Sequence, residues 1–138
     1  MNKQKLKEII AKYQLEDNDI FVLNFRGKST PIVTRQGVEK IQKYLGIQVN
    51  YKVEHLSDDL KSCVVLATGV IFDNHSQNPQ ARPKKLIQSF GEASPANNKN
   101  NWSVCMAEKR ALARVILKMA DLFGIYGEDE SEDFKNNG

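Results

Sequence analysis

The sequence predicts an α+β fold, with an antiparallel three-stranded β-meander and a long helix packed across it. Three strand-like segments follow one another over residues 47–92, and their connections favour pairing between successive strands. Apolar residues then recur at helical spacing over about residues 102–123. A sheet with one apolar face and a helix with one apolar stripe bury both by packing together, which gives a β-β-β-α core. An N-terminal helix and one short strand are expected before this core.

The first part of the chain supplies two helices and the short strand. The first helix is indicated by apolar residues at helical spacing, namely Leu6, Ile9, Ile10 and Tyr13. Residues 19–25 (DIFVLNF) are typical of a strand, and the RGKSTP that follows is typical of a turn. A second helix is predicted over 35–45, with Thr34 as its N-cap and Gly46 at its C-terminal end.

The three strands of the meander differ in their patterns. Apolar and polar residues alternate over 47–56, as in a strand with one solvated face. β-Branched residues fill 62–73, and a third strand is predicted over 84–92. A polar loop leads to the long helix, whose core side is expected to carry Leu112, Val115, Ile116, Met119, Leu122 and Phe123. Leu117 points away from that side and is a candidate subunit contact.

Composition indicates one soluble globular domain. The 138 residues are 41% hydrophobic and 27% charged, which is enough for a core without disulfides. No apolar run approaches a membrane span, and the polar start MNKQKLKEII is unlike a signal peptide, so we expect a cytoplasmic protein without membrane contact. Cys63 and Cys105 are expected to be reduced core residues, and with His55 and His75 they show no zinc-site spacing. No metal and no cofactor is predicted.

The net charge of +3 conceals an asymmetry between two parts of the chain. Residues 127–138 hold five carboxylates and one lysine, a net charge of −4, so residues 1–126 carry +7. We therefore predict a basic domain over 1–126 and an acidic, disordered tail over 127–138. A basic domain favours a polyanionic partner, and the tail would compete for the same surface. Alternatively, the tail solubilises the protein or docks a partner through Phe134.

Three cations follow one line along the long helix. Arg110, Arg114 and Lys118 recur every four residues, which places them in a stripe beside the apolar side. Like charges at this spacing repel each other by a few tenths of a kcal/mol. A solvated polar face is one interpretation, which acidic neighbours would support, yet only Asp121 falls on that line. The other interpretation is a surface that binds phosphates.

Three segments occur in an order that resembles the Rad52-like single-strand annealing proteins of phages and eukaryotes. They are TRQGVEKIQKYLGI at 34–47, SFGEASP at 89–95 and MAEKRALARVILKMADLFG at 106–124. The resemblance covers about residues 34–126 and rests on element order and residue type. It implies rings or filaments assembled through the sheet, single-stranded DNA in a basic groove, and annealing of complementary strands without ATP. The chain departs from the family in having only the acidic tail where the family has a long C-terminal partner-binding region.

The resemblance implies DNA-backbone contacts at matching positions of this chain. These are Arg35, Lys109, Arg110, Arg114 and Lys118. It also implies a homo-oligomer. The strand over 62–73 carries few charges, so we expect its edge to pair between subunits in an assembly larger than a dimer.

The chemistry of single-strand binding adds further candidates. Sequence-neutral binding needs cations that follow phosphates and aromatic faces that stack on bases. Lys84 and Lys85 cluster with Arg82 at the start of the third strand, and Lys99 lies in the loop before the long helix. Trp102 at the helix entrance is placed to stack on a base, or otherwise to cap the edge of the core. The asparagines around Lys99 offer amides to phosphates or base edges.

Two other functions remain open from the sequence. The α-β-β-β-α order is also that of a double-stranded RNA-binding domain, and EKRA resembles the lysine-rich start of its last helix. A metal-dependent nuclease would need two or three converging carboxylates. The available ones are Asp58, Asp59, Asp73, Glu92 and Glu108, and none has a recognisable catalytic spacing. We therefore predict a binding protein and no enzyme.

Overall fold

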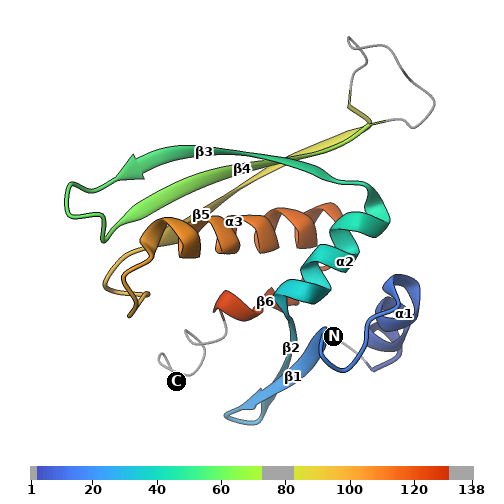
Figure 1. Ribbon diagram of the computed structural model, residues 1–138. Helices are drawn as coiled ribbons and strands as arrows, with labels where there is room; N and C mark the ends of the chain where they lie inside the picture. Colours follow the sequence, from blue (N-terminus) through green and yellow to red (C-terminus); the bar gives the residue numbers. More distant parts are fainter. Residues whose placement is uncertain (1–2, 73–82, 131–138) are drawn as a thin grey trace.

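The computed structural model describes residues 3–72 and 83–130. In this part of the chain, three α-helices, a short 3₁₀-helix and two three-stranded sheets form an α+β architecture (Figure 1). The elements are α1 (Lys3–Tyr13), β1 (Ile20–Phe25), β2 (Lys28–Val33), α2 (Arg35–Leu45), β3 (Gln48–Leu56), β4 (Cys63–Ile71), β5 (Lys85–Ala93), α3 (Ser103–Met119), β6 (Tyr126–Gly127) and η1 (Glu128–Glu130). The predicted α+β class is confirmed.

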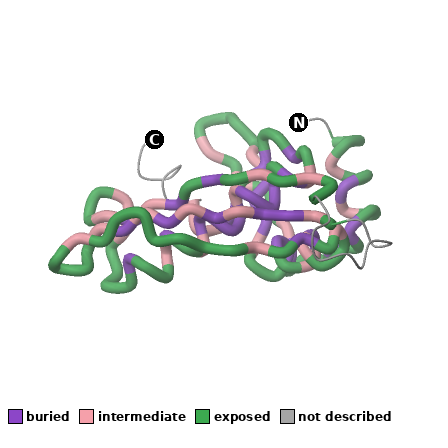
Figure 2. Tube along the Cα trace, turned by 90° about the horizontal axis from the view of Figure 1, so that it is seen from above, coloured by how far each residue is buried: buried purple, intermediate pink, exposed green. Residues whose placement is uncertain are grey.

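The larger sheet is the predicted antiparallel meander, in the order β3-β4-β5. Thr68 of β4 pairs with Asn50 of β3 and with Gln88 of β5. Residues of β4 alternate between buried and partly buried, whereas β3 is exposed along almost its whole length (Figure 2). The difference arises because α3 packs mainly across β4 and β5. We expected the strand over 62–73 to pair its edge with another subunit. This strand is β4, which lies in the centre of the sheet with β3 and β5 on its two sides.

Small residues let α3 lie close to the larger sheet. Ala107 and Ala111 of α3 are fully buried. A Cβ atom at Gly91 of β5 would lie 2.1 Å from the Ala107 carbonyl oxygen and 2.4 Å from the Ala111 nitrogen, so a side chain does not fit there. Gly69 of β4 is less crowded, since its nearest neighbour would be a Val115 methyl at 3.2 Å. Backbone contact thus sets the distance between α3 and β5.

The smaller sheet, in the order β1-β2-β6, differs from the predicted single short strand. Residues 28–33, most of which were expected to form a turn, are a strand paired antiparallel with β1. Pro31 is typical of turns, and here it pairs with Val22 on one side only. β6 runs parallel to β2 and pairs only with Ile32 and Val33, so Pro31 lies beyond its end.

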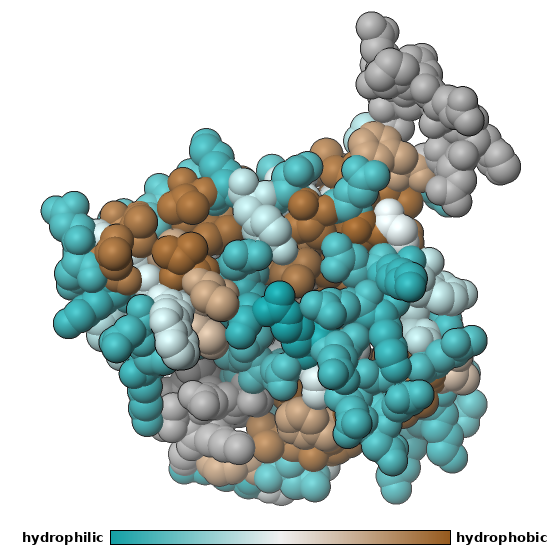
Figure 3. Space-filling model, viewed as in Figure 1, coloured by the Kyte–Doolittle hydropathy of each residue, from teal (hydrophilic) through white to brown (hydrophobic). Residues whose placement is uncertain are grey.

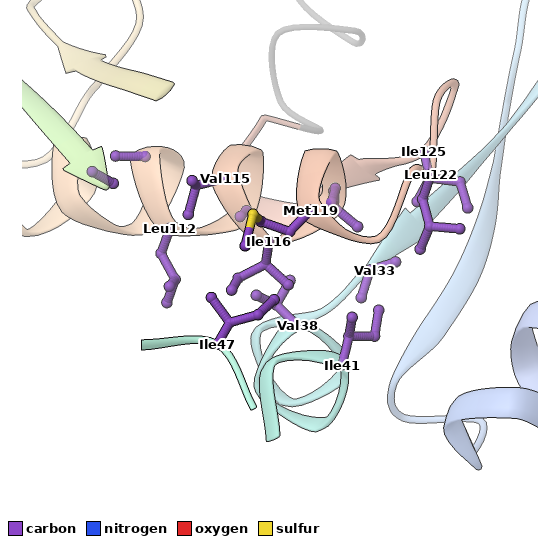
Figure 4. Close-up of a cluster of buried hydrophobic side chains, with 14 of the residues drawn as sticks. Val33, Val38, Ile41, Ile47, Leu112, Val115, Ile116, Met119, Leu122 and Ile125 are labelled. Atoms are coloured by element: carbon purple, nitrogen blue, oxygen red, sulfur yellow. The ribbon is translucent and has the colours of Figure 1, made fainter. Parts of the chain in front are cut away.

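The smaller sheet and α2 cover the side of α3 that faces away from the larger sheet (Figure 1). Figure 4 shows Val33, Val38 and Ile41 gathered near Ile116 and Met119 of α3. Ten of the seventeen residues of α3 are buried, so the helix lies inside the domain between two layers. The sequence predicted a helix covered on one side only.

Three side chains are placed differently from the prediction. Leu117, expected to be a subunit contact, is buried in the core. Phe123, expected on the core side, is 71% exposed, because α3 ends before it and Asp121 turns the chain with a φ of 57°. Cys105 is exposed, whereas Cys63 is buried as expected.

The predicted helix over 35–45 is confirmed as α2, and so are both of its ends. The Thr34 hydroxyl oxygen accepts a hydrogen bond from the Gly37 nitrogen over 3.3 Å, as an N-cap does. Gly46 follows the last turn with a φ of 68°, a conformation that favours glycine. These caps fix the start of α2 beside the C-terminal segment of the chain.

Candidate nucleic-acid interface

Arg110 is buried, and its hydrogen bonds link α3 to β5, to the loop after β5 and to η1. Its side chain lies on α3 with only 3% of the residue exposed. Its guanidinium donates to the carbonyl oxygens of Glu92 and Asn97 over 2.8 Å each, and of Asp129 over 3.3 Å. Arg110 is therefore not the exposed phosphate contact that the sequence predicted, because β5, the loop after it and η1 cover its side chain.

Arg114, one turn further along α3, is paired with two carboxylates. Its Nη1 and Nη2 atoms bind the two Glu92 oxygens over 2.7 and 2.9 Å, and its Nε binds Glu130 Oε1 over 2.6 Å. The hydrogen bonds from Arg114 lower the pKa of Glu92. Burial works to lower the pKa of Arg114, but the two carboxylates outweigh it, so the guanidinium stays charged. The stripe therefore has the acidic neighbours that the sequence did not reveal.

Lys118 ends the stripe and is the member that stays exposed. Its Nζ atom lies 3.1 Å from the Ser89 hydroxyl oxygen. Nearby, Lys85 Nζ donates to the Met119 carbonyl oxygen over 2.9 Å, which caps the C-terminal end of α3. Lys84 is exposed beside it, and Arg82 of the same predicted cluster lies outside the described residues.

An acidic turn, Glu128–Glu130, packs against α3 and the start of α2. Glu128 Oε1 accepts a hydrogen bond of 2.8 Å from the backbone nitrogen of Arg35. This nitrogen belongs to the first turn of α2, where amides lack helical partners and the helix dipole favours negative charge. The other two residues of the turn meet the two arginines of α3, as described above.

Asp129, in the middle of the acidic turn, lies among three cations. Burial raises the pKa of its carboxyl group. Attraction to Lys109 works against this shift, repulsion by Glu128 adds to it, and Arg110 and Arg35 contribute smaller attractions. The direction shows that desolvation outweighs the cations, so the ionised carboxylate is costly at this position.

The start of the predicted tail belongs to the folded domain. Tyr126 and Gly127 pair with β2, and a Cβ atom at Gly127 would lie 2.7 Å from the Ala113 methyl carbon. The boundary that we expected at residue 127 therefore moves beyond Glu130 in the described part of the chain. Residues 131–138, with Phe134, lie outside the described residues.

An open cleft of about 560 Å³ lies beside the acidic turn. It is lined by Phe21 of β1, by the loop residues Asn98, Lys99 and Asn100, and by Met106 and Arg110 of α3, with Glu128 and Asp129 at the turn. Phe21 is 41% exposed, so its ring is accessible from this cleft. The cleft thus combines a cation, side-chain amides and an aromatic ring, of which the aromatic ring was not among the sequence candidates.

Five of the nine candidate residues surround the acidic turn, namely Arg35, Lys99, Lys109, Arg110 and Arg114. They come from α2, from the loop before α3 and from α3 itself. Lys84, Lys85 and Lys118 gather near the other end of α3. The sequence signal for these partners was the run of acidic residues in the C-terminal segment, since Glu128 and Glu130 of that run bind Arg35 and Arg114.

Trp102 stands at the N-terminal end of α3 and is 71% exposed. Its predicted role in capping the core edge is therefore not what the structure shows, and its ring is free to contact a ligand. Apolar side chains are also exposed around this end of the domain, namely Val53, Leu56, Leu60 and Val104. Figure 3 shows apolar surface over the β3–β4 hairpin and the start of α3, where β3 extends past the helix.

The carboxylates considered for a nuclease do not converge in the part of the chain that the structure describes. Asp59 accepts hydrogen bonds from the Ser57 hydroxyl and the Lys61 nitrogen, which makes it part of the β3–β4 turn. Glu92 is bound to Arg114, and Asp73 lies outside the described residues. Over residues 3–72 and 83–130, no three histidine, cysteine, aspartate or glutamate side chains are grouped to hold a metal ion. In the same part of the chain, every helix is too short or too polar to cross a membrane.

No protein-family model matches the chain, and no curated protein matches it significantly. The resemblance to the Rad52-like proteins therefore rests on the segments quoted from the sequence. The geometry around the acidic turn is the further evidence on function.

Proposed function

We propose that this protein binds single-stranded DNA through cations on α2, α3 and the loop between β5 and α3, and anneals complementary strands without ATP. One observation carries the proposal. Besides the buried Arg110, four candidate cations from three separate parts of the chain lie around one segment, and that segment is anionic. A site that binds two carboxylates of the chain itself and attracts a third has the charge and the donors to hold phosphates.

Aromatic rings near these cations support a single strand as the ligand. Phe21 lines the cleft with Lys99, and Trp102 is exposed at the start of α3. Unpaired bases stack on such rings without sequence preference, whereas a duplex keeps its bases stacked inside. The order α2-β3-β4-β5-α3 is also compatible with a double-stranded RNA-binding module, which the assay below includes.

We propose further that the protein forms an oligomer through the edges of the larger sheet. Within the described residues, β3 and β5 each have one neighbouring strand, so both offer an edge to another copy. The exposed apolar residues Val53 and Leu56 lie on β3 where α3 leaves the strand uncovered. A copy bound at this edge would cover them. The Rad52-like resemblance implies such an assembly through the sheet.

The proposal is tested with a labelled oligothymidylate, duplex DNA and duplex RNA, titrated with the protein while fluorescence anisotropy is recorded. Single-strand binding that weakens steeply between about 50 and 200 mM salt is expected. Tighter binding to duplex RNA would favour the double-stranded RNA-binding module. Annealing is followed by quenching between complementary labelled strands without ATP, and native mass spectrometry with and without oligothymidylate reports the oligomer. Absence of binding at low salt would refute the proposed function.

A further inference from the structure

We propose that the acidic turn Glu128–Glu130 is an intramolecular competitor of the nucleic acid, which holds the phosphate-binding cations and has to leave them when a strand binds. This inference rests on the proposed function and adds a mode of regulation at the same site. It concerns Glu128, Asp129 and Glu130 alone, and not residues 131–138 of the acidic segment.

Each residue of the turn meets a different part of the candidate surface. Glu128 binds the backbone nitrogen of Arg35 over 2.8 Å. Glu130 binds Arg114, on the other side of the turn. Asp129 lies between them, near Lys109. Two carboxylates of the turn thus occupy hydrogen-bond donors that phosphate oxygens would use, and the third lies near a lysine.

Hydrogen bonds and ion pairs hold the turn, and none of its residues belongs to the hydrophobic core, so it can separate from the domain while the fold stays intact. All three of its residues are partly exposed, and none is buried. The apolar anchor ends just before it, where Ile125 is buried and Gly127 packs on Ala113. Hydrogen bonds to charged groups contribute about 1.5–3 kcal/mol each and exposed ion pairs about 0–1 kcal/mol, which is far less than the core contributes.

Release of the turn would free some cations and leave others in place. The Arg35 backbone nitrogen, Lys109 and the Glu130 side of Arg114 become available to phosphates, whereas the Arg35 guanidinium keeps its ion pair with Glu39. Arg110 keeps its bonds to the carbonyl oxygens of Glu92 and Asn97, so it stays structural. Because the turn is tethered to the domain, its effective concentration at these cations is high, on the order of millimolar. A bound strand therefore replaces anions of the protein, and fewer counterions are released than at a free basic surface.

The test compares two full-length variants that each remove three negative charges. One is Glu128→Gln, Asp129→Asn, Glu130→Gln, which keeps side-chain size in the acidic turn. The control is Glu8→Gln, Glu54→Gln, Asp58→Asn, at exposed positions that do not line the clefts beside the turn. Affinity for labelled oligothymidylate is measured by anisotropy from about 50 to 200 mM salt, and circular dichroism checks that both variants are folded.

We expect the turn variant to bind on the order of tenfold more tightly at low salt, which corresponds to about 1.4 kcal/mol. Its salt dependence should steepen by about 0.7 for each additional phosphate that the protein neutralises. The control variant should show neither the full increase in affinity nor the steeper slope. If both variants bind alike, the competitor is refuted while the proposed function stands. If neither variant nor the wild type binds at low salt, the proposed function itself fails.

Hydrogen exchange on the wild-type chain tests the same inference without a substitution. With saturating oligothymidylate, the backbone amides of residues 128–130 should exchange faster than in the free protein, since the turn has left α3. Unchanged or slower exchange there would show that the turn stays docked under the bound strand, which overturns the inference. Increased protection elsewhere on the domain would identify the strand-binding surface and leave the proposed function in place.

Discussion

Arg114 and Glu92 form a bidentate ion pair that joins α3 to β5, with N–O distances of 2.7 and 2.9 Å. The same guanidinium also holds Glu130. The side chain of Arg114 is 26% exposed, so the pair is only partly screened by water. Arg114, the middle residue of the cation stripe on α3, is therefore part of the tertiary structure. It links α3 to β5 and to the acidic turn, and so it stabilises the fold as well as contributing a positive charge.

Replacing Arg114 with alanine should lower the free energy of unfolding by about 1–3 kcal/mol, because two carboxylates lose their partner. Lys118→Ala, one turn away, is the control and should stay within about 0.5 kcal/mol of the wild type, since Lys118 is exposed. Denaturant unfolding measures both. An Arg114→Ala protein as stable as the control would mean that the ion pair contributes nothing net.

Arg110→Met should destabilise the protein by about 2–4 kcal/mol. Methionine keeps an unbranched apolar stem but lacks the guanidinium, so three carbonyl oxygens are left without their donor. Thermal unfolding followed by circular dichroism is the measurement, and Arg110→Lys, which keeps the charge, should recover only part of the loss. Equal stability of the methionine variant and the wild type would contradict the role of Arg110 as a tie between α3, β5 and the loop.

Gly91→Ala should destabilise the fold by about 3 kcal/mol or more, because the added methyl group overlaps the Ala107 carbonyl oxygen and the Ala111 nitrogen. Gly69→Ala is the matched control on the neighbouring strand, where the first neighbour is a Val115 methyl at 3.2 Å that can adjust. Denaturant midpoints of the two variants are compared. If the two substitutions cost the same, α3 and β5 are not in close backbone contact at Gly91.

The Glu92 carboxyl should make part of the stability depend on pH. Its folded pKa lies below its ordinary value of 4.5 because of Arg114. The ionised form therefore stabilises the folded protein above pH 4.5, and this contribution is lost as the pH falls through the lowered folded pKa. The difference in unfolding free energy between wild type and Glu92→Gln should shrink as the pH is lowered through this range. The opposite shift of Asp129 is present in both proteins and cancels in the comparison. A difference that does not change with pH would remove Glu92 as the cause.

Lys99→Ala combined with Lys109→Ala should weaken single-strand binding without affecting stability. Lys99 and Lys109 each line a cavity that Glu128 and Asp129 also line, so both lie beside the acidic turn. Their positive charges can hold phosphates there. The salt slope should fall by about 0.7 for each phosphate that the variant no longer neutralises. Lys43→Ala with Lys61→Ala removes the same charge from exposed positions elsewhere and serves as the control in the same anisotropy titration. Equal slopes for the two double variants would move the binding surface away from the turn.

The sequence by itself determined those helices and strands that depend on short local patterns, such as helix caps and β-branched runs. Thr34 and Gly46 define the ends of α2 because capping is a local hydrogen-bond requirement. The alternation along 47–56 and the β-branched run that follows predicted two strands of the meander correctly, but β3 is exposed along almost its whole length and not on one face only. The acidic composition of the C-terminal segment was also evident, although not where it would pack.

Only the tertiary structure decided which charges meet and which side of α3 is covered. The Arg35 nitrogen and Glu128 are 93 positions apart, and no local pattern connects them. The β1-β2-β6 sheet forms because Ile32 and Val33 pair with the far end of the chain, which outweighs the turn-like composition around Pro31. The chain that continues from β6 brings Glu130 to Arg114, and Leu117, on the same helix, is buried in the core. Helical periodicity places cations on one line, but burial and pairing depend on what the rest of the chain lays against that line.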